Sequence, residues 1–410
     1  MTDQQTFVIV GANLAGGRAA FALRAEGFAG RILLIGADPE PPYERPPLSK
    51  EYLRGDMAKD KLFIAGPEVY DDRRIDLLLG VRATRLDAQE HFVELETGER
   101  IPYEKLLLAT GGYPRRLDVP GSELGGIYEL RTMADSERIS AELQPGRRMV
   151  TIGAGIIGAE IAASARMKGL HVTMIEALPV PLMRSLGEEM GGVYADIHRD
   201  HGVHLHTNEA IERFEGPARV ERVVTNTGRS IECDFVVVGI GIVPATELAE
   251  SGGLEIDNGV VVNEYCETSA PDVYACGDVA NLFHPLLGYR LRIEHWSNAQ
   301  NQAAAAAKSM LGQREPYIDI PWFWSDQYDL NLQYVGHAQR WDEVVLRGDV
   351  TGRKFTAFYI EGGQLRAALT INRHRDIRPA RELIRQGVAI ESAKLRDEEI
   401  ELKSLVPAAP

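Results

Sequence analysis

Two stretches of the chain repeat the same order of apolar and polar positions. The first has an uninterrupted apolar run at 6–11 (TFVIVG), a glycine-rich turn, an alanine-rich helical segment and a second apolar run at 31–36 (RILLIG). The second stretch begins with 149–153 (MVTIG) and ends with the run 171–175. A short apolar run predicts a strand that is buried on both faces, so each stretch predicts one βαβ unit. Two such units indicate a doubly wound α/β fold with two dinucleotide sites.

The turns inside these units have the glycine spacing that brings a pyrophosphate to a helix N-terminus. The first glycine permits the tight turn, the second lets the backbone approach the phosphates, and the third lets the helix pack on the strand. The second copy, 153–158 (GAGIIG), has all three glycines. In the first copy, 11–16 (GANLAG), Asn13 replaces the middle glycine. We expect this turn to survive, because Asn tolerates unusual backbone angles better than most residues.

A carboxylate after the second strand of each unit selects the nucleotide sugar. Glu176 directly follows the strand of the second unit, where it accepts hydrogen bonds from ribose hydroxyls and repels a 2′-phosphate. No Arg or Lys lies beside it, and the nearest on its C-terminal side is Arg184, so NAD is favoured over NADP. In the first unit Asp38 is the carboxylate nearest to the strand end at Gly36. Its register is open by one or two residues, and a solvated turn aspartate remains the alternative.

Composition and charge exclude several classes of protein. The chain has 410 residues, of which 44% are hydrophobic and 26% charged, so a fibre, a disordered chain and a small disulfide-stapled scaffold are excluded. A formal charge of −15 disfavours nucleic-acid binding. No apolar run reaches about 18 residues, so we expect no membrane span.

The cysteines indicate the compartment. Cys233, Cys266 and Cys276 form no CxxC and no metal-ligand spacing. Free thiols together with an N-terminus that lacks the layout of a secretory signal predict a cytoplasmic protein. The four histidines of 198–206 (HRDHGVHLH) are not expected to hold a metal, because Gly202 separates a helix end from a strand start.

Three further segments pair a buried strand with a small-residue turn: 105–112 (KLLLATGG), 235–244 (FVVVGIGIVP) and 268–278 (TSAPDVYACGD). With the two glycine turns they resemble the flavoproteins that have two dinucleotide-binding domains, a glutathione-reductase-like fold. The resemblance implies that the first unit binds FAD and the second binds NAD(P)H. It also implies that Asp278 binds the ribityl chain of FAD, a role compatible with a helix N-cap.

Other segments indicate the branch of this family. Disulfide and peroxide reductases carry cysteines after the first unit, whereas no cysteine here precedes Cys233, so electrons must leave the flavin to an external acceptor. The segments 45–50 (RPPLSK) and 321–328 (PWFWSDQY) resemble the NADH-dependent ferredoxin reductases of bacterial cytochrome P450 and ring-hydroxylating oxygenase systems. The resemblance extends from Phe7 to about Leu405.

That resemblance implies a function. Hydride passes from NADH to N5 of tightly, non-covalently bound FAD, and single electrons then pass to a [2Fe–2S] ferredoxin that feeds a cytochrome P450 or a ring-hydroxylating oxygenase. A monomer or weak dimer is expected. Because such ferredoxins are acidic, a local basic surface should dock them, and the candidates are Arg290, Arg292, Arg314, Arg340 and Arg353.

Two alternatives stay open. One is a rubredoxin reductase or another NADH–flavin reductase with a different acceptor. The other is a redox-sensing binding protein similar to apoptosis-inducing factor, in which an NADH complex changes shape or partners. The lifetime of the NADH-reduced protein in air would separate a sensor from a reductase.

The resemblance also implies residue roles. Lys50 and Glu160 match a Lys–Glu pair beside the flavin, where the ammonium stabilises negative charge on the reduced ring and Glu160 holds the ammonium. A solvated helix residue is the alternative for Glu160. The FAD positions are Gly11, Asn13, Ala15, Gly16, Asp38, Arg45, Lys50, Ala83, Ala109, Gly111, Arg116, Arg131, Gly277, Asp278 and Trp296. The NAD positions are Gly153, Gly155, Ile156, Ile157, Gly158, Glu160, Glu176, Arg184, Gly239, Ile240 and Gly241.

The expected domain organisation has three parts. Residues 1–112 and 241–319 form the FAD domain, 113–240 form the NAD domain, and 320–410 form a small α+β domain. The segments WFWSDQYDLNLQYVG, FTAFYI and LRAALTI predict antiparallel strands in the last of these. We expect Trp322 and Trp324 to point to opposite faces of their strand, one into the core and the other towards the flavin or a partner.

Overall fold

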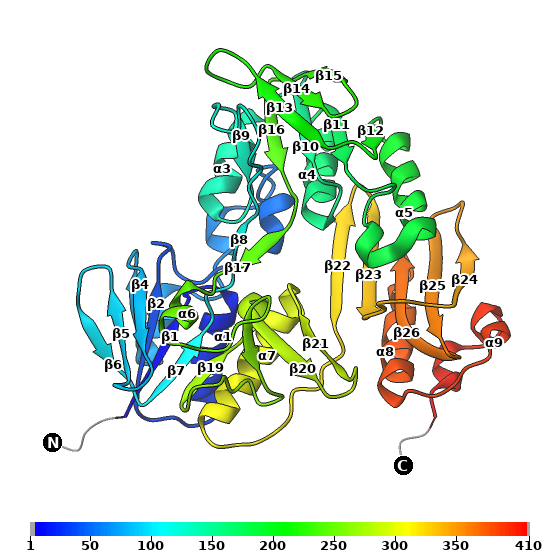
Figure 1. Ribbon diagram of the computed structural model, residues 1–410. Coiled ribbons are helices and arrows are strands. Elements are labelled where there is room, and N and C mark those ends of the chain that lie inside the picture. The colour runs from blue at the N-terminus through cyan, green and yellow to red at the C-terminus, as the bar shows by residue number, and fades with distance from the viewer. Residues whose placement is uncertain (1–4, 408–410) are drawn as a thin grey trace. The chain divides into compact units, whose positions relative to one another are not determined.

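A computed structural model describes residues 5–407. The chain divides into two compact units (Figure 1). Unit 1 comprises Met1–Arg45, Lys59–Tyr113 and Val243–Pro321, and unit 2 comprises Pro46–Ala58, Pro114–Ile242 and Trp322–Pro410. Unit 2 therefore holds both the second βαβ unit and the C-terminal segment, and the short segment Pro46–Ala58 groups with it.

Unit 1 is built on a parallel sheet with the order β19-β7-β1-β2-β3. Its strands are Val273–Ala275, Lys105–Leu108, Thr6–Val10, Arg31–Gly36 and Ile75–Leu79. The predicted strands of the first βαβ unit are confirmed, and the predicted helix is α1 (Leu14–Ala25). All but the first residue of β2 are buried, as expected for a strand covered on both faces.

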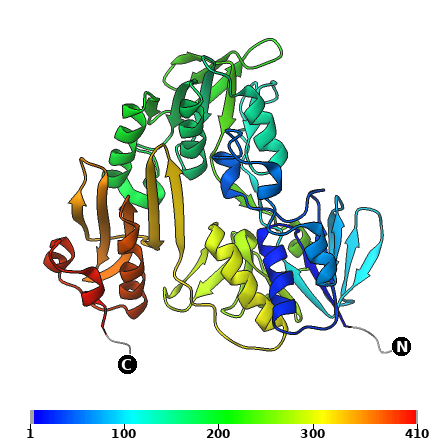
Figure 2. The same cartoon turned by 180° about the vertical axis from the view of Figure 1, so that it is seen from behind.

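Different elements cover the two faces of this sheet. On one face, alternate strand residues such as Ile9 and Leu34 pack against α1 and α7 (Trp296–Met310), which lie side by side (Figure 2). On the other face, Val8 and Leu33 pack under an antiparallel sheet. That sheet consists of β4 (Ala83–Asp87), β5 (Phe92–Leu95) and β6 (Arg100–Pro102). A further sheet has the order β18-β20-β21, formed by Val260–Val262, Ala280–His284 and Tyr289–Arg292.

Unit 2 contains a second parallel sheet with the order β12-β11-β10-β16-β9. Its strands are His204–Thr207, His171–Glu176, Arg148–Ile152, Phe235–Val238 and Ile127–Glu129. One face packs against α3 (Met133–Glu142) and α4 (Ile156–Met167). The other face packs against an antiparallel sheet of β13 (Ile211–Glu215), β14 (Arg222–Thr225) and β15 (Ser230–Glu232). The repeat predicted from the sequence is thus confirmed as two layered parallel sheets.

The C-terminal part of unit 2 is an antiparallel sheet with the order β22-β23-β26-β25-β24, as the sequence predicted. Its strands are Trp322–Gln327, Leu330–Gly336, Gln364–Ile371, Lys354–Glu361 and Glu343–Asp349. The buried side of α5 (Met183–Asp200) packs on one face of this sheet. The helix α8 (Ile377–Gln386) packs against β26 and β23.

The expected orientation of the two tryptophans is wrong. Trp322 and Trp324 stack on each other, with ring centroids 5.3 Å apart and an angle of 20° between the ring planes. Residues two apart in a strand point to the same face, so the pair shares one side of β22. The opposite side of this strand carries Ser325 and Gln327, both of which are buried.

Within residues 5–407, no helix combines the length and the apolar character needed to cross a membrane.

Candidate functional site

The turn between β1 and α1 requires glycine at two positions. Gly11 has φ +117°, and a Cβ on it would lie 2.1 Å from the carbonyl oxygen of Ala109. A Cβ on Gly16 would lie 2.0 Å from the carbonyl oxygen of Gly11. Gly11 therefore sits against the strand-end residue Ala109, and Gly16 lets α1 pack tightly on the turn. A Cβ on Gly277 would meet the Cβ of Ala15 at 3.1 Å, so the Gly277-Asp278 segment also borders this turn.

Asn13 preserves this turn by a different mechanism from the expected one. Its backbone has φ −115° and ψ −168°, which is ordinary extended geometry that any residue adopts. Its side chain caps α1 instead, because Oδ1 accepts hydrogen bonds from the backbone N–H groups of Ala15 at 3.0 Å and Gly16 at 3.4 Å. Its Nδ2 donates to the carbonyl oxygen of Ala109 at 2.5 Å. Asn13 thus ties the helix N-terminus to the neighbouring strand end.

The structure resolves the register of Asp38. Val10 pairs with Ile35 in unit 1 as Ile152 pairs with Ile175 in unit 2, so Gly36 takes the place that Glu176 has in the second copy. Asp38 lies two residues farther on, is half-buried, and accepts hydrogen bonds from the Tyr43 hydroxyl at 2.9 Å and from the N–H of Glu40 at 3.1 Å.

Two other expected FAD residues in unit 1 have clear surroundings. The indole N–H of Trp296, at the start of α7, donates to Glu44, whose carboxylate also lies 3.4 Å from the Arg18 guanidinium. This contact orients the indole, whose position the sequence left open. The Arg45 guanidinium lies over the Tyr43 ring, 5.3 Å from its centroid.

In unit 2 the turn between β10 and α4 repeats the glycine geometry. A Cβ on Gly153 would lie 2.4 Å from the carbonyl oxygen of Gly239, and a Cβ on Gly158 would lie 2.0 Å from that of Gly153. Nothing lies within 4 Å of a Cβ on Gly155, and no side chain caps α4 there. The space in front of this helix N-terminus is therefore open, and its N–H groups favour an anion.

Glu176 is fixed at the edge of this turn. One carboxylate oxygen accepts from the N–H of Ala154 at 2.7 Å, and the other accepts from the N–H of Leu178 at 2.9 Å. The carboxylate is half-buried, so it retains accessible lone pairs for ribose hydroxyls. Arg184 is exposed in the first turn of α5 and makes no ion pair with Glu176 in the described part of the chain.

These observations test whether dinucleotides fit the two turns. Both turns have glycines where a Cβ would strike backbone, and the second turn has open space before an uncapped helix. Both sets of residues fit a dinucleotide pyrophosphate. Among residues 5–407, no three His, Cys, Asp or Glu side chains are grouped to hold a metal ion.

The expected positions are distributed over both units. All of the expected NAD positions lie in unit 2. Most of the expected FAD positions lie in unit 1, where Ala83 begins β4 in a separate sheet and Gly111 follows β7. Three lie in unit 2: Lys50, the exposed Arg116 and the half-buried Arg131. Arg116 lies 3.8 Å from Glu129.

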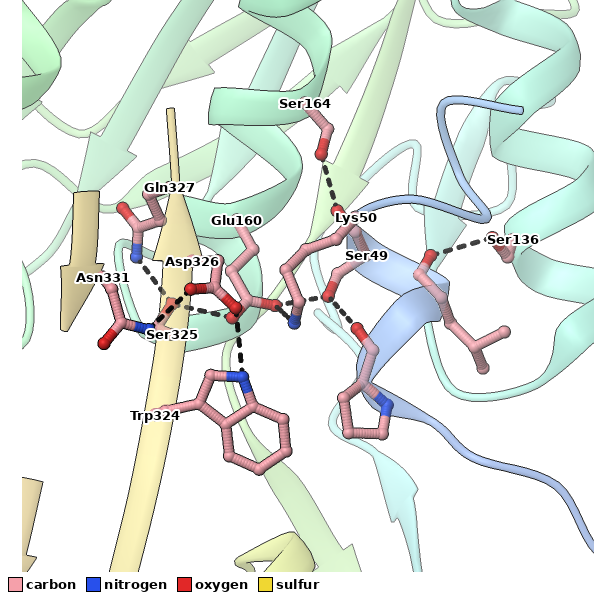
Figure 3. Close-up of polar contacts among 12 residues, drawn as sticks. Ser49, Lys50, Ser136, Glu160, Ser164, Trp324, Ser325, Asp326, Gln327 and Asn331 are labelled. Carbon is pink, nitrogen blue, oxygen red and sulfur yellow. Dashed lines mark hydrogen bonds and ion pairs between the residues drawn. The ribbon is translucent and has the colours of Figure 1, made fainter. Parts of the chain in front are cut away.

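The structure brings Lys50 and Glu160 together inside unit 2 (Figure 3). Glu160 projects from α4 and is 2% exposed, and the Lys50 ammonium lies 3.0 Å from its Oε2. The Ser49 hydroxyl donates to the same oxygen, and the Ser325 hydroxyl of β22 donates to Oε1 at 2.7 Å. A buried ion pair persists only when such additional hydrogen bonds satisfy its remaining polar atoms. A solvated Glu160 is thereby excluded.

Sequence reasoning missed the serines of this cluster. Ser49 and Lys50 are positioned by two buried serines, since Ser136 donates to the carbonyl of Leu48 and Ser164 donates to that of Ser49, both at 2.8 Å. Ser325 is likewise fully buried in β22. The signal available in the sequence was polar residues at inward positions of otherwise apolar elements.

Two of the four histidines, His198 and His201, contact Tyr328, which follows Ser325 by three residues. His198 of α5 is fully buried, and its Nδ1 lies 3.0 Å from the Tyr328 hydroxyl. The ring of Tyr328 stacks on that of His201, with centroids 3.6 Å apart. Burial lowers the pKa of His198 to about 4, so its imidazole is neutral at pH 7.

This burial predicts an acid-sensitive stability. The folded-state pKa of His198 lies below its unfolded value of 6.5, so the folded protein binds fewer protons. Its contribution to the free energy of unfolding is complete above about pH 6.5 and is lost as the pH falls towards 4, by about 3 kcal/mol in all. Urea unfolding of the parent and of His198→Asn at pH 7 and pH 4.5 measures this. We expect the difference in stability between the two proteins to shrink at pH 4.5; a constant difference would contradict the assignment.

The arginines proposed for partner docking are divided between the two units, three in unit 1 and two in unit 2. Arg290 donates to backbone carbonyls, and each of the others lies within ion-pairing distance of a carboxylate: Arg292, Arg314, Arg340 and Arg353. Basic side chains are also frequent in α8 and in the short segment before it. The segment 373–385 contains five arginines and two carboxylates, a net charge of +3 in a chain of −15. Arg378, Arg381 and Arg385 are spaced three and four residues apart, along one face of the helix.

Comparison with known proteins adds to this geometry. Residues 5–303 match the pyridine nucleotide-disulphide oxidoreductase family, and residues 322–406 match the reductase C-terminal family. Rhodocoxin reductase of Rhodococcus erythropolis is 39% identical over 399 residues, which cover 97% of this chain and 93% of that protein. Putidaredoxin reductase CamA of Pseudomonas putida is 36% identical over 415 residues, which cover 100% of this chain and 98% of that protein.

Solved structures give the same result. The putidaredoxin reductase of a covalent complex with putidaredoxin superposes with a TM-score of 0.95 at 36% identity, covering 98% of each chain. The ferredoxin reductase for the CYP199A2 system of Rhodopseudomonas palustris has a TM-score of 0.95 at 35% identity, covering 98% of this chain and 100% of that one.

Proposed function

The chain belongs to the pyridine nucleotide-disulphide oxidoreductase family, and on that premise we propose that it is an FAD-dependent NADH:ferredoxin reductase. The observation that carries the proposal is the pair of dinucleotide turns in one chain that lacks an accessible thiol. The first turn, at Gly11 and Gly16, would hold FAD, and the second, at Gly153 and Gly158, would hold NADH. FAD, when bound, supplies the ability to accept a hydride and to release electrons one at a time.

The cysteines support an external acceptor. All three cysteines are buried, and none lies in a disulfide. Burial raises the pKa of Cys233 and of Cys266 to about 12, and that of Cys276 well above its usual range. The thiolate is the nucleophilic form, so none of these side chains is suited to carry electrons at neutral pH. Buried, unpaired cysteines also suit the cytoplasm, where we propose that the protein works.

The residues of unit 2 would bind and orient NADH. The α4 N-terminus would hold the pyrophosphate, and Glu176 would accept hydrogen bonds from the adenosine ribose. We propose that Lys50 supplies positive charge at the hydride-transfer site and that Glu160 fixes the ammonium.

The partner is proposed from the relatives. The structural neighbour was solved with putidaredoxin, and similar proteins are named as reductase components of oxygenase systems, such as the anthranilate 1,2-dioxygenase system of Burkholderia cepacia. We propose a [2Fe–2S] ferredoxin as the acceptor here, in the service of a cytochrome P450 or an oxygenase. The experiment is anaerobic mixing with NADH or NADPH: NADH should bleach the flavin quickly and NADPH slowly, and a flavin that neither bleaches would refute the proposal.

Replacing Glu176 by glutamine should weaken the preference for NADH. The amide keeps one acceptor oxygen but removes the charge that repels a 2′-phosphate, so the ratio of kcat/KM for NADH to that for NADPH should fall by roughly tenfold or more. The matched control is Asp38→Asn, which neutralises the carboxylate of unit 1 and should leave the ratio unchanged. An unchanged ratio in Glu176→Gln would show that this carboxylate does not read the ribose.

Reversing charge on α8 should weaken the acceptor complex. Arg378→Glu reverses an exposed arginine that makes no ion pair within the described residues, so the KM for ferredoxin should rise roughly tenfold at low salt and less at high salt. Flavin reduction by NADH should not change. Arg340→Glu, which reverses an arginine already paired with Glu361, is the control. Equal KM values for both variants would remove α8 from the docking surface.

A further inference from the structure

The carboxylate of Glu160 is held by two parts of the chain that are far apart in sequence. Ser49 and Lys50 contact its Oε2, and Ser325, from the segment that matches the reductase C-terminal family, contacts its Oε1. Figure 3 shows Glu160 between Lys50 and the strand that carries Ser325. The C-terminal segment thus contacts the charged pair directly, and does not only pack against α4.

The direction of each hydrogen bond follows from chemistry. Glu160 is paired with an ammonium and can only accept, so the single proton of the Ser325 hydroxyl points to it. Ser325 Oγ must then accept, and its partner is the Gln327 side-chain N–H at 3.0 Å. This leaves Gln327 Oε1 as a buried acceptor that has no hydrogen-bond partner within the described residues.

His198 carries a second buried polar atom of this kind. Burial raises the pKa of Tyr328, so its hydroxyl stays protonated and donates to Nδ1 of the neutral His198. The ring proton therefore sits on Nε2, which is likewise buried and without a partner in the described structure. No hydrogen bond joins these two atoms within the described residues, so the hydrogen-bonded chain that begins at Glu160 ends at Gln327.

We propose that Ser325 and Gln327 are positioning residues that hold Glu160, and through it Lys50, in the geometry required for hydride transfer. The chain of donors runs from Gln327 through Ser325 to Glu160, and each proton in it points towards the carboxylate. Aligned donors polarise one another and strengthen the last bond, the one to the charged group. The role assigned to Glu160 rests on the proposed function; the hydrogen-bond chain itself does not.

Ser325→Ala tests the chain at its most important bond. Glu160 Oε1 loses its donor, so Glu160 and Lys50 should become less well fixed. We expect the limiting rate of flavin reduction by NADH to fall about tenfold, with the Kd for NADH changed less than twofold, because the lost contact acts on the transition state rather than on binding. Gln327→Met, which keeps the Ser325 bond but removes the polarising donor, should give a smaller fall of about threefold.

A readout independent of NADH completes the test. The midpoint potential of the bound flavin, measured by dye equilibration with dithionite, should become more negative in Ser325→Ala, because a less fixed ammonium stabilises the reduced ring less. A tenfold change in the reduction equilibrium corresponds to about 30 mV for two electrons. The matched control is Thr370→Val, in the same sheet as Ser325. It removes a fully buried hydroxyl that has no hydrogen-bond partner within the described residues.

The outcomes separate the two proposals. If both the rate and the potential of Ser325→Ala equal those of Thr370→Val, the positioning role is refuted. If NADH fails to reduce even the parent protein, the proposed function has failed. The midpoint potentials alone then decide whether Ser325 and Gln327 act on the flavin. Rates that fall in the order Ser325→Ala, Gln327→Met, Thr370→Val, together with a shifted potential, would support the inference.

Discussion

Replacing Glu160 by glutamine is expected to slow flavin reduction by NADH about a hundredfold and to lower the free energy of unfolding by about 3 kcal/mol. Glu160 is the counterion of Lys50, whose side chain is only 6% exposed. Removing one partner of a buried ion pair leaves an uncompensated charge in the interior, which costs about 3–5 kcal/mol. The rate falls because an ammonium without its carboxylate is no longer held at the place where negative charge develops.

Two measurements check this prediction. Stopped-flow reduction gives the limiting rate, and urea unfolding gives the stability. The double variant Lys50→Met with Glu160→Gln is the control, since removing both charges should restore most of the stability but none of the rate. A Glu160→Gln protein that reduces its flavin at the parental rate would remove Glu160 from the hydride step.

Replacing Gly158 by alanine should abolish tight NADH binding while leaving the protein yellow. A Cβ there would lie 2.0 Å from the carbonyl oxygen of Gly153, so the turn must shift, and with it the N–H groups that face the pyrophosphate. We expect the Kd for NADH to rise about a hundredfold or more, which corresponds to roughly 3 kcal/mol. Gly16→Ala makes the equivalent clash with Gly11 in unit 1 and should instead give a protein that purifies without FAD.

Gly155→Ala is the informative companion. Its backbone has φ −73°, and nothing in the structure lies within 4 Å of a Cβ there, so the fold should tolerate it. NADH binding should still weaken, because the methyl group would enter the space expected to hold the pyrophosphate. Parental NADH affinity in Gly155→Ala would mean that the nucleotide lies elsewhere.

The fold was largely predictable because its main signals are local. Apolar runs at 6–11 and 149–153 mark strands buried on both faces. In the turns after them, a Cβ on the first or the last glycine of each motif would strike backbone. The family resemblance, which rested on the segments 45–50 and 321–328, is confirmed by full-length relatives. These signals depend on neighbours within a few residues of each other.

Other features depend on register and could not be read from the chain. Asp38 lies two residues beyond the position of Glu176, because Gly36 pairs at the strand end in unit 1. Asn13 keeps its turn through side-chain capping and not through unusual backbone angles. Both required the strand pairing and the side-chain conformations.

The polar cluster around Glu160 joins elements distant in sequence. Ser325 comes within 2.7 Å of Glu160, 165 residues away along the chain. His198 stood out in the sequence only as one of four crowded histidines. Its neutral state at pH 7 follows from its burial against Tyr328. The five arginines proposed for docking stay a prediction, and the sequence did not reveal that four of them lie near carboxylates.

The central claim is that electrons from NADH leave this protein one at a time to an iron–sulfur carrier. The most direct measurement is reduction of cytochrome c by the purified flavoprotein with NADH, with and without a [2Fe–2S] ferredoxin and over a range of salt concentrations. We expect a large ferredoxin-dependent increase that salt suppresses and that NADPH does not support. Rapid bleaching of the flavin by NADH, with no gain from any of several ferredoxins, would contradict it.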